Sequence, residues 1–192
     1  MIDREAACST KENPGRIIIK CNAVIDDEII DHLYSAAKKH VFITLIVRGI
    51  CGINPEYLPE EYAGNIRIIS ILDRYLEHGR IYFFHNNGVP EYYTGSSDLM
   101  PRNLHRRIEV LYPVEDPSLR AELDMILQIQ LHDRRKGRRM VGENKYTKTH
   151  SALKYENTRS QKVLYEYYKK RLEEKKMEEK KFDGPLKVFR KK

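Results

Sequence analysis

The sequence lacks the features of a secreted, disulfide-bonded or membrane-spanning protein. Its 192 residues include only three cysteines, without CxxC spacing, which argues against a disulfide framework or a zinc site and favours a reducing compartment. The longest apolar run, Val41–Val47, is far shorter than the roughly 20 residues that a membrane span needs. The first ten residues carry no basic segment followed by an apolar stretch, so they predict no secretory signal.

Acidic residues are scarce toward the C-terminal end, and the charge of the chain is therefore uneven. The net charge of the whole chain is +7. Residues 134–192 hold 21 basic and 8 acidic residues, whereas residues 1–133 hold 14 and 20. A basic extension on a mildly acidic body favours either a guide for polyanions or a solvated helix. With 41% hydrophobic residues, the body can still bury a core.

The order of the strand and helix patterns predicts a mixed α/β fold. Arg16–Cys21 has the pattern of a buried strand, a helix opens at Asp26, and Val41–Val47 is a second, β-branched strand. Strand, helix and strand form a βαβ unit, which implies parallel pairing and a right-handed crossover. Further strands are expected at Ile66–Ile71, Arg80–Phe84, Glu91–Thr94 and Arg107–Tyr112.

Two more helices are expected in the C-terminal half of the chain. Asp116 and Pro117 start the first, because Asp caps helix N-termini and Pro fits the first helical position. The second covers residues 159–181, where an apolar stripe gives way to Glu and Lys. The sequence thus predicts a mixed sheet of about six strands flanked by helices over residues 1–135. A basic, partly helical extension is expected over residues 136–192.

Polar residues follow two of the predicted parallel strands, at the edge where open α/β sheets bind ligands. Asn22 follows the first strand, and Arg48 follows the second with Gly49 behind it. The planar guanidinium of Arg48 is suited to hold two phosphate oxygens at once. An arginine that merely pairs with a surface acid has the same sequence pattern, and the pattern alone favours that simpler interpretation.

A histidine and a polar patch complete the candidate site. His78 lies just before a predicted strand, where an imidazole can be a nucleophile, an acid or a ligand near neutral pH. Most single histidines in such a place only form a hydrogen bond at the strand edge. A dense polar patch between two strands suits either phosphate binding or a charged surface helix. The patch contains Ser96, Asp98, Arg102 and Asn103.

Taken together, these motifs resemble the C-terminal catalytic domain of the histidine-dependent polyphosphate kinases. The resemblance runs in order over about residues 1–135, with weaker similarity beyond. It rests on GRIIIKCN at 15–22, LIVRGIC at 45–51, RYLEH at 74–78, RIY at 80–82 and RIEV at 107–110, together with Ser96, Asp98 and Met100. That family has a phospholipase D-like fold, in which a histidine from each of two similar domains faces one phosphate site.

The resemblance implies reversible transfer of the terminal phosphoryl group of ATP to inorganic polyphosphate through a phosphohistidine. The phosphorylated histidine and the ligands of Mg²⁺, the implied cofactor, are expected in a preceding domain outside this chain. The chain is therefore expected to be about the last quarter of a larger enzyme, and the N-terminal part of that enzyme is the expected partner. A homo-oligomeric, bacterial, cytoplasmic enzyme is also implied, with peripheral membrane association allowed and no nucleic-acid partner.

Carried over by position, the resemblance also implies residue roles. His78 corresponds to the second active-site histidine of the family and is the expected catalytic residue. Together with Arg48 and Arg80 it is expected to bind ATP or phosphate. Asp98 is expected to orient His78 by accepting an imidazole N–H, and no metal ligand is expected in this chain. The expected supporting residues are Asn22, Ser96, Asp98, Arg102 and Asn103.

The sequence departs from the usual phospholipase D motif, and two other functions stay open. Arg80 replaces the lysine of that motif, as expected for the kinase family, and His85 stands at its aspartate position. The first alternative is a non-catalytic module that binds polyphosphate or nucleotide. The second is a phospholipase D-type phosphodiesterase or nuclease, for which one half of the site is too little.

Overall fold

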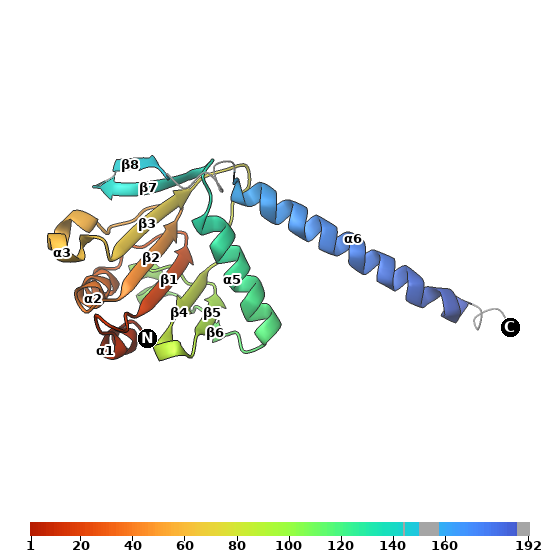
Figure 1. The fold of residues 1–192 in the computed structure, drawn as a ribbon, viewed down its shortest axis with the longest axis horizontal. Helices are drawn as coiled ribbons and strands as arrows, with labels where there is room; N and C mark the ends of the chain where they lie inside the picture. Colours follow the sequence, from red (N-terminus) through yellow and green to blue (C-terminus); the bar gives the residue numbers. More distant parts are fainter. Residues whose placement is uncertain (144, 150–157, 188–192) are drawn as a thin grey trace.

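An eight-stranded sheet forms the centre of the computed structural model, which describes residues 1–143, 145–149 and 158–187 (Figure 1). The strand order is β6-β5-β4-β1-β2-β3-β7-β8. Strands β1, β2 and β3 pair in parallel, and all other neighbours are antiparallel. The strands are β1 (Arg16–Cys21), β2 (Phe42–Val47), β3 (Ile66–Ile71), β4 (Ile81–Phe84), β5 (Glu91–Gly95), β6 (Leu111–Pro113), β7 (Gly137–Gly142) and β8 (Lys145–Lys148).

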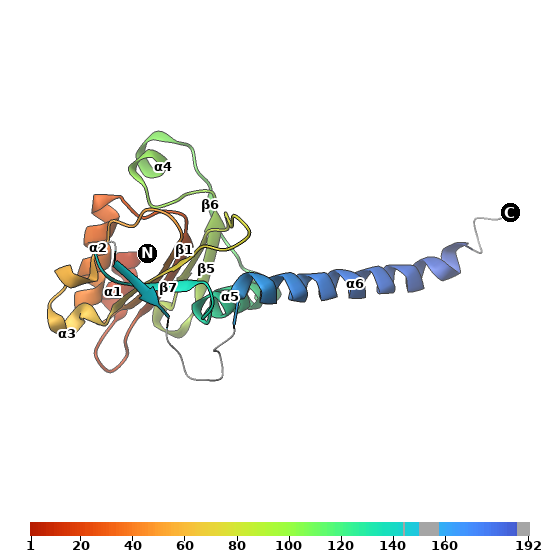
Figure 2. The same cartoon turned by 90° about the horizontal axis from the view of Figure 1, so that it is seen from above.

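Helices cover both faces of the sheet: α1, α2 and α3 lie on one face and α5 lies on the other (Figure 2). The capping residues that the sequence predicts are in place. Asp26 accepts a hydrogen bond from the main-chain N of Ile29, and Asp116 accepts from that of Leu119. The helices are α1 (Ile2–Cys8), α2 (Asp27–Lys38), α3 (Glu60–Ala63), α4 (Pro101–Arg106), α5 (Pro117–Leu131) and α6 (Ser160–Lys187), with 3₁₀ turns at Pro55–Tyr57 and Asn86–Gly88.

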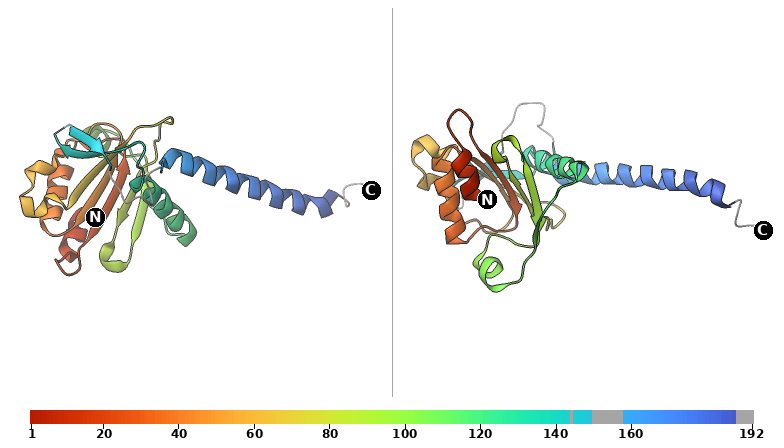
Figure 3. Two further views of the ribbon diagram at one scale, coloured as in Figure 1. Left: turned by 45° about the horizontal axis from the view of Figure 1, so that its top comes forward. Right: turned by 90° about the horizontal axis from the view of Figure 1, so that it is seen from below.

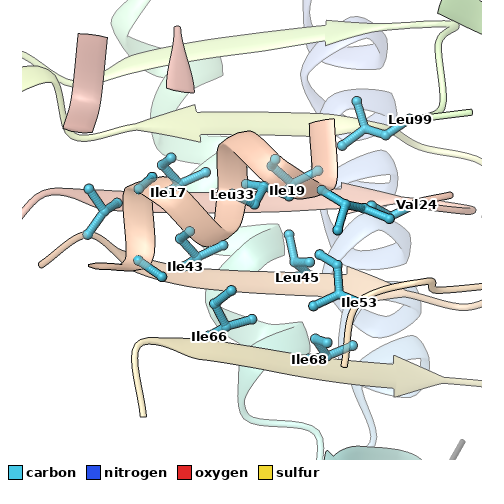
Figure 4. Packing of buried hydrophobic residues seen from close by; sticks show 14 of the residues in the cluster. Ile17, Ile19, Val24, Leu33, Ile43, Leu45, Ile53, Ile66, Ile68 and Leu99 are labelled. Carbon is cyan, nitrogen blue, oxygen red and sulfur yellow. The ribbon is translucent and has the colours of Figure 1, made fainter. Parts of the chain in front are cut away.

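The alternation of side chains along each strand divides the core into two layers. Ile17 and Ile19 of β1 face α2 and pack near its Leu33 (Figure 4). Ile18 faces the other way and packs with Leu127 of α5. Because both faces are covered, the central strands read as continuous apolar runs, which is why the sequence identified them.

The sheet has two strands more than the sequence predicted. Strands β7 and β8 lie in the basic region, and β7 pairs with β3, placing Arg139 opposite Ile69. Met140 is the one large apolar side chain that β7 buries, so the strand has no hydrophobic pattern to reveal it. The sheet therefore continues past residue 135. At the other edge, the strand expected at 107–112 is the three-residue β6 at Leu111–Pro113, so residues 107–110 are not part of it, and α1 was not predicted.

Helix α6 begins at the body of the molecule and then projects away from it (Figure 3). Its first turn is capped by the buried carboxylate of Asp133, which accepts from the main-chain N of Ser160 over 2.8 Å. About two and three turns further on, Tyr168 and Arg171 bind Glu122 of α5. The helix expected at 159–181 is thus confirmed. No helix in the described part of the chain is long and apolar enough to cross a membrane.

Candidate phosphoryl-transfer site

Four strands bring the candidate residues to one edge of the sheet. Strands β1, β2 and β5 end at this edge, and β4, which runs antiparallel to β1, begins there. Side chains that follow or precede these strands therefore meet. We call the group that is joined by hydrogen bonds the strand-edge cluster, and it consists of Asn22, Arg48, His78, Arg80 and Asp98.

Asp98 lies at the centre of the strand-edge cluster and binds Arg80 in a two-point pair. Its Oδ2 accepts from Nη2 of Arg80 over 2.9 Å, and its Oδ1 accepts from Nε over 3.1 Å. Oδ1 also accepts from the main-chain N of Asn22 over 2.7 Å. Burial acts to raise the pKa of Asp98, but the hydrogen bonds from Arg80 and Asn22 outweigh it and hold the pKa below its ordinary value.

His78 is held by Arg48 and not by Asp98. Nη2 of Arg48 lies 3.2 Å from Nε2 of His78, and Nε of Arg48 donates to Oδ1 of Asn22 over 2.6 Å. Because a guanidinium only donates, Nε2 is the acceptor, and the neutral ring carries its proton on Nδ1. The expectation that Asp98 orients His78 is wrong, since arginine and asparagine donors occupy both oxygens of the carboxylate.

Arg80 connects the buried carboxylate to the main chain around the histidine. Its Nη1 donates to the main-chain O of His78 over 2.8 Å. The hydrogen bonds with Asp98 raise the pKa of Arg80, so the guanidinium stays protonated. These contacts leave further N–H groups of the guanidinium unused, and a phosphate oxygen can accept from them.

A buried lysine supports the site from beneath, and the sequence analysis did not single it out. Nζ of Lys20 donates to the main-chain O of Gly79 over 3.0 Å and lies 3.3 Å from Oε2 of Glu77. Glu77 in turn accepts from Nε2 of Gln130 on α5 over 2.5 Å. Burial lowers the pKa of Lys20, and Glu77 partly offsets this. A lysine within an apolar strand was the available signal, because a charge in the core requires a partner.

The first turn of α6 holds the loop that carries His78. Arg159 donates to both carboxylate oxygens of Asp73, over 2.6 and 2.7 Å. Gln161 exchanges two hydrogen bonds of 2.8 Å with the main chain of Tyr75. The side chain of Asp73 is 1% exposed, and the hydrogen bond from Arg159 lowers its pKa. The start of the C-terminal helix therefore positions residues 73–75 of the loop.

Gly49 allows the loop after β2 to lie against the loop after β1. Its main-chain N donates to the main-chain O of Asn22 over 2.8 Å. A Cβ at this position would lie 2.7 Å from the same oxygen, closer than side chains tolerate. A glycine next to Arg48 is thus required for the contact that brings Arg48 to Asn22.

Three expected supporting residues lie outside the strand-edge cluster. Ser96 and Asn103 both donate to the carboxylate of Glu109, Asn103 over 2.5 Å. Arg102 is exposed on α4 and makes no hydrogen bond or ion pair with any residue that the structure describes. Glu109 itself was part of the RIEV string but was given no role, because sequence spacing does not show which donors face it.

The residues present do not fit a magnesium site. In the described ranges, no group of three or more His, Cys, Asp or Glu side chains is placed to hold a metal ion. The carboxylate of the strand-edge cluster, Asp98, is already bound by Arg80 and Asn22. The expectation that the Mg²⁺ ligands lie outside this chain stays a prediction.

Known proteins similar to this chain point to one family. Residues 1–161 match the family model described as polyphosphate kinase C-terminal domain 2. The chain belongs to the polyphosphate kinase family. It is 47% identical over 147 residues to polyphosphate kinase 1 of Chlorobaculum tepidum, covering 77% of this chain and 21% of the relative. It is 44% identical over 164 residues to the polyphosphate kinase of Synechocystis sp., covering 85% and 22%.

Solved structures support both the family and the fold. A crystal structure of the polyphosphate kinase from Porphyromonas gingivalis matches with a TM-score of 0.80 and 39% identity, over 90% of this chain and 26% of that one. Nuc from Salmonella typhimurium, a phospholipase D family member, matches with a TM-score of 0.50 at 14% identity, which shows the fold alone. The predicted phospholipase D-like α/β fold is confirmed. The chain spans about a fifth to a quarter of these kinases.

Proposed function

We propose that this chain supplies half of a polyphosphate kinase active site, which moves the terminal phosphoryl group of ATP reversibly onto inorganic polyphosphate. One observation carries the proposal: in a chain of this family, Nη2 of Arg48 contacts Nε2 of His78 beside an arginine that a buried carboxylate holds. Guanidinium and imidazole groups at a common sheet edge suit the oxygens of a migrating phosphate, because guanidinium groups donate in pairs to such oxygens.

Phosphoryl transfer depends more on how the protein positions the reacting groups and stabilises their charge than on covalent bonds to the protein. Charge spreads over the phosphoryl oxygens during transfer, and fixed cations that already face this position lower the barrier. Arg48 and Arg80 supply those cations, and Asp98 keeps Arg80 oriented. His78 binds the migrating phosphate or passes a proton to it. A histidine of the preceding domain attacks the terminal phosphorus of ATP in line, and the bond to ADP breaks as ADP leaves. The phosphohistidine then gives the phosphoryl group to a terminal oxygen of polyphosphate, which frees the histidine.

The remainder of the enzyme is the partner in this proposal. Because the chain spans about a fifth to a quarter of its relatives, the N-terminal part supplies the phosphorylated histidine and the Mg²⁺ ligands. ATP and inorganic polyphosphate are the substrates. The complete enzyme is a cytoplasmic homo-oligomer that associates at most peripherally with membranes and does not act on nucleic acid.

A chimaera tests the proposal directly. In the Chlorobaculum tepidum relative, this chain replaces the matching C-terminal fifth, and polymer formation from ATP is measured. We expect activity from the chimaera and a loss of at least about 100-fold in His78→Ala, since acid–base groups contribute about 100-fold or more. His85→Ala is the matched control, because His85 lies at the opposite end of β4 from His78. It should keep activity.

Each competing function predicts a different result. Full activity of the His78→Ala chimaera would contradict the proposed role of His78. Tight binding of polyphosphate by the isolated chain, with an inactive chimaera, would favour the binding module. Hydrolysis of a simple phosphodiester by the isolated chain would favour the phospholipase D-type enzyme.

A further inference from the structure

Three arginines gather on the α5 side of the sheet, outside the strand-edge cluster. Arg139 of β7 is opposite Ile69 of β3, and Ile69 belongs to the core layer under α5. Arg67 lies two residues before Ile69 and therefore shares its face. Burial lowers the pKa of Arg67, and the nearby charges of Arg134 and Arg139 lower it further. The three positive charges are thus close enough to repel one another.

The guanidinium groups of Arg67 and Arg134 are deeply set and lack partners. Nε of Arg67, and both Nε and Nη1 of Arg134, are buried without a hydrogen bond to any residue in the described ranges. A buried donor without an acceptor lowers the stability of the folded chain by about 1–3 kcal/mol. Stability of the free chain therefore does not explain why these arginines are buried.

No carboxylate in the described part of the chain balances these charges. Strands β2, β3 and β7 contain no Asp or Glu. Asp133 precedes Arg134, but its oxygens accept from main-chain N–H groups and from Ser160. The two acids of α5, Glu122 and Asp124, accept from other side chains. The acceptors that the arginines lack must therefore come from elsewhere.

We propose that Arg67, Arg134 and Arg139 form a second phosphate-binding site, which holds a segment of inorganic polyphosphate away from the Arg48–His78 contact. Guanidinium groups on three separate elements suit a linear chain of phosphates, because each can donate to oxygens of a different phosphate unit. A single protein carboxylate would satisfy only one of them. Thr44, opposite Arg67 in the β2–β3 register, adds a hydroxyl donor on this face.

This second site rests on the proposed function for its ligand, but its test is separate. The ¹⁵N-labelled chain is titrated with inorganic tripolyphosphate, and amide shifts are followed at two groups of residues. The first group, at the second site, is Thr44, Ile69 and Val141. The second group, at the strand-edge cluster, is Asn22, Gly79 and Asp98. We expect both groups to move.

Variants then assign each response to its site. Arg67→Gln with Arg139→Gln should weaken binding at the first group at least tenfold, or about 1.4 kcal/mol, and leave the second group unchanged. Arg48→Gln with His78→Ala should do the reverse. Lys38→Gln is the control, because Lys38 is exposed at the end of α2 on the other face of the sheet. It should change neither response.

Stability gives a second readout that does not depend on ligand shifts. Removing one charge from an uncompensated cluster should raise the free energy of unfolding of the Arg67→Gln chain at low salt. Tripolyphosphate should stabilise the wild-type chain more than it stabilises this variant.

Two results would overturn the second site. One is that the amide signals of the first group do not shift at millimolar tripolyphosphate. This would indicate that an acidic protein segment supplies the missing counter-charge. The other is an equal shift in the wild-type chain and the Arg67→Gln, Arg139→Gln variant. A moving first group with a silent second group would support the second site and count against the proposed function.

Discussion

Arg48 lies with its Nη2 3.2 Å from Nε2 of His78, while its Nε binds the side chain of Asn22. One guanidinium thus joins the end of β1, the end of β2 and the loop before β4. Because a guanidinium has no lone pair to offer, the contact also decides which nitrogen of the imidazole carries the proton.

We expect the tautomer of His78 to depend on Arg48. In the neutral ring of the wild-type chain, the proton should be on Nδ1, as two-bond ¹⁵N–¹H spectra of the ring can show. Arg48→Met removes the donor, so the population with the proton on Nε2 should increase. Arg106→Met, an exposed arginine on α4, is the control and should change nothing. An unchanged His78 spectrum in Arg48→Met would contradict the contact.

Asp98→Asn should destabilise the chain by about 3 kcal/mol at pH 7, because it leaves the guanidinium of Arg80 without its charged partner in a buried place. The measurement is urea-induced unfolding. Asp31→Asn, at an exposed position of α2, is the matched control and should change the free energy of unfolding by less than about 0.5 kcal/mol.

The effect of Asp98→Asn should also depend on pH. The folded pKa of Asp98 lies below its ordinary value of 3.8, so the stability from its ionised form is fully present above about pH 4. It is lost as the pH falls through the lowered pKa. The stability difference between wild type and variant should therefore shrink in acid. A difference that stays constant from pH 7 to pH 2 would show that ionisation of Asp98 plays no part.

Gly49→Ala should cost about 1–3 kcal/mol, because its Cβ would meet the main-chain O of Asn22 at 2.7 Å and push the two loops apart. Gly64→Ala is the matched control: nothing lies within 4 Å of a Cβ there, and the backbone is in the right-handed helical region. Thermal unfolding compares the two. Equal effects would show that the loops after β1 and β2 tolerate separation.

Lys20→Met should lower the free energy of unfolding by about 1–3 kcal/mol at neutral pH, since the main-chain O of Gly79 loses its donor. Lys38→Met, at an exposed position, should have little effect. The pH dependence has a definite sign. Because the folded pKa of Lys20 lies below its ordinary value of 10.5, the folded state binds fewer protons between the two values. Wild-type stability relative to Lys20→Met should rise with pH in that window.

Arg159→Gln should loosen the loop that carries His78, because it removes the two-point pair with Asp73. Hydrogen exchange of the amides at 73–79 is the measurement, and it should become faster. Arg171→Gln removes one of the two contacts of α6 with Glu122 but leaves the start of the helix intact, so loop exchange should stay as in the wild type. Slow exchange in both variants would mean that α6 does not hold the loop.

Strong local patterns made most of the fold predictable. Ile17, Ile18 and Ile19 are all buried, because helices cover both faces of β1, and such continuous β-branched runs identify central strands in a sequence. Asp26 and Asp116 cap their helices by binding residues only three positions along the chain, so the sequence also predicted them. The sequence did not reveal strands β7 and β8, because β7 is held by main-chain pairing with β3 and β8 by pairing with β7, and their side chains carry little apolar signal.

In the site, too, some features follow from local sequence and others from contacts between distant segments. From the sequence, the βαβ pattern placed Asn22 and Arg48 at this edge, and the family resemblance added His78 and Arg80. Only the tertiary structure decided which of them bind each other. Asp98 holds Arg80 and leaves His78 to Arg48, and Lys20 supports Gly79 from the core. Hydrogen bonds depend on tenths of an ångström between segments far apart in the chain, and residue spacing carries no information at that scale.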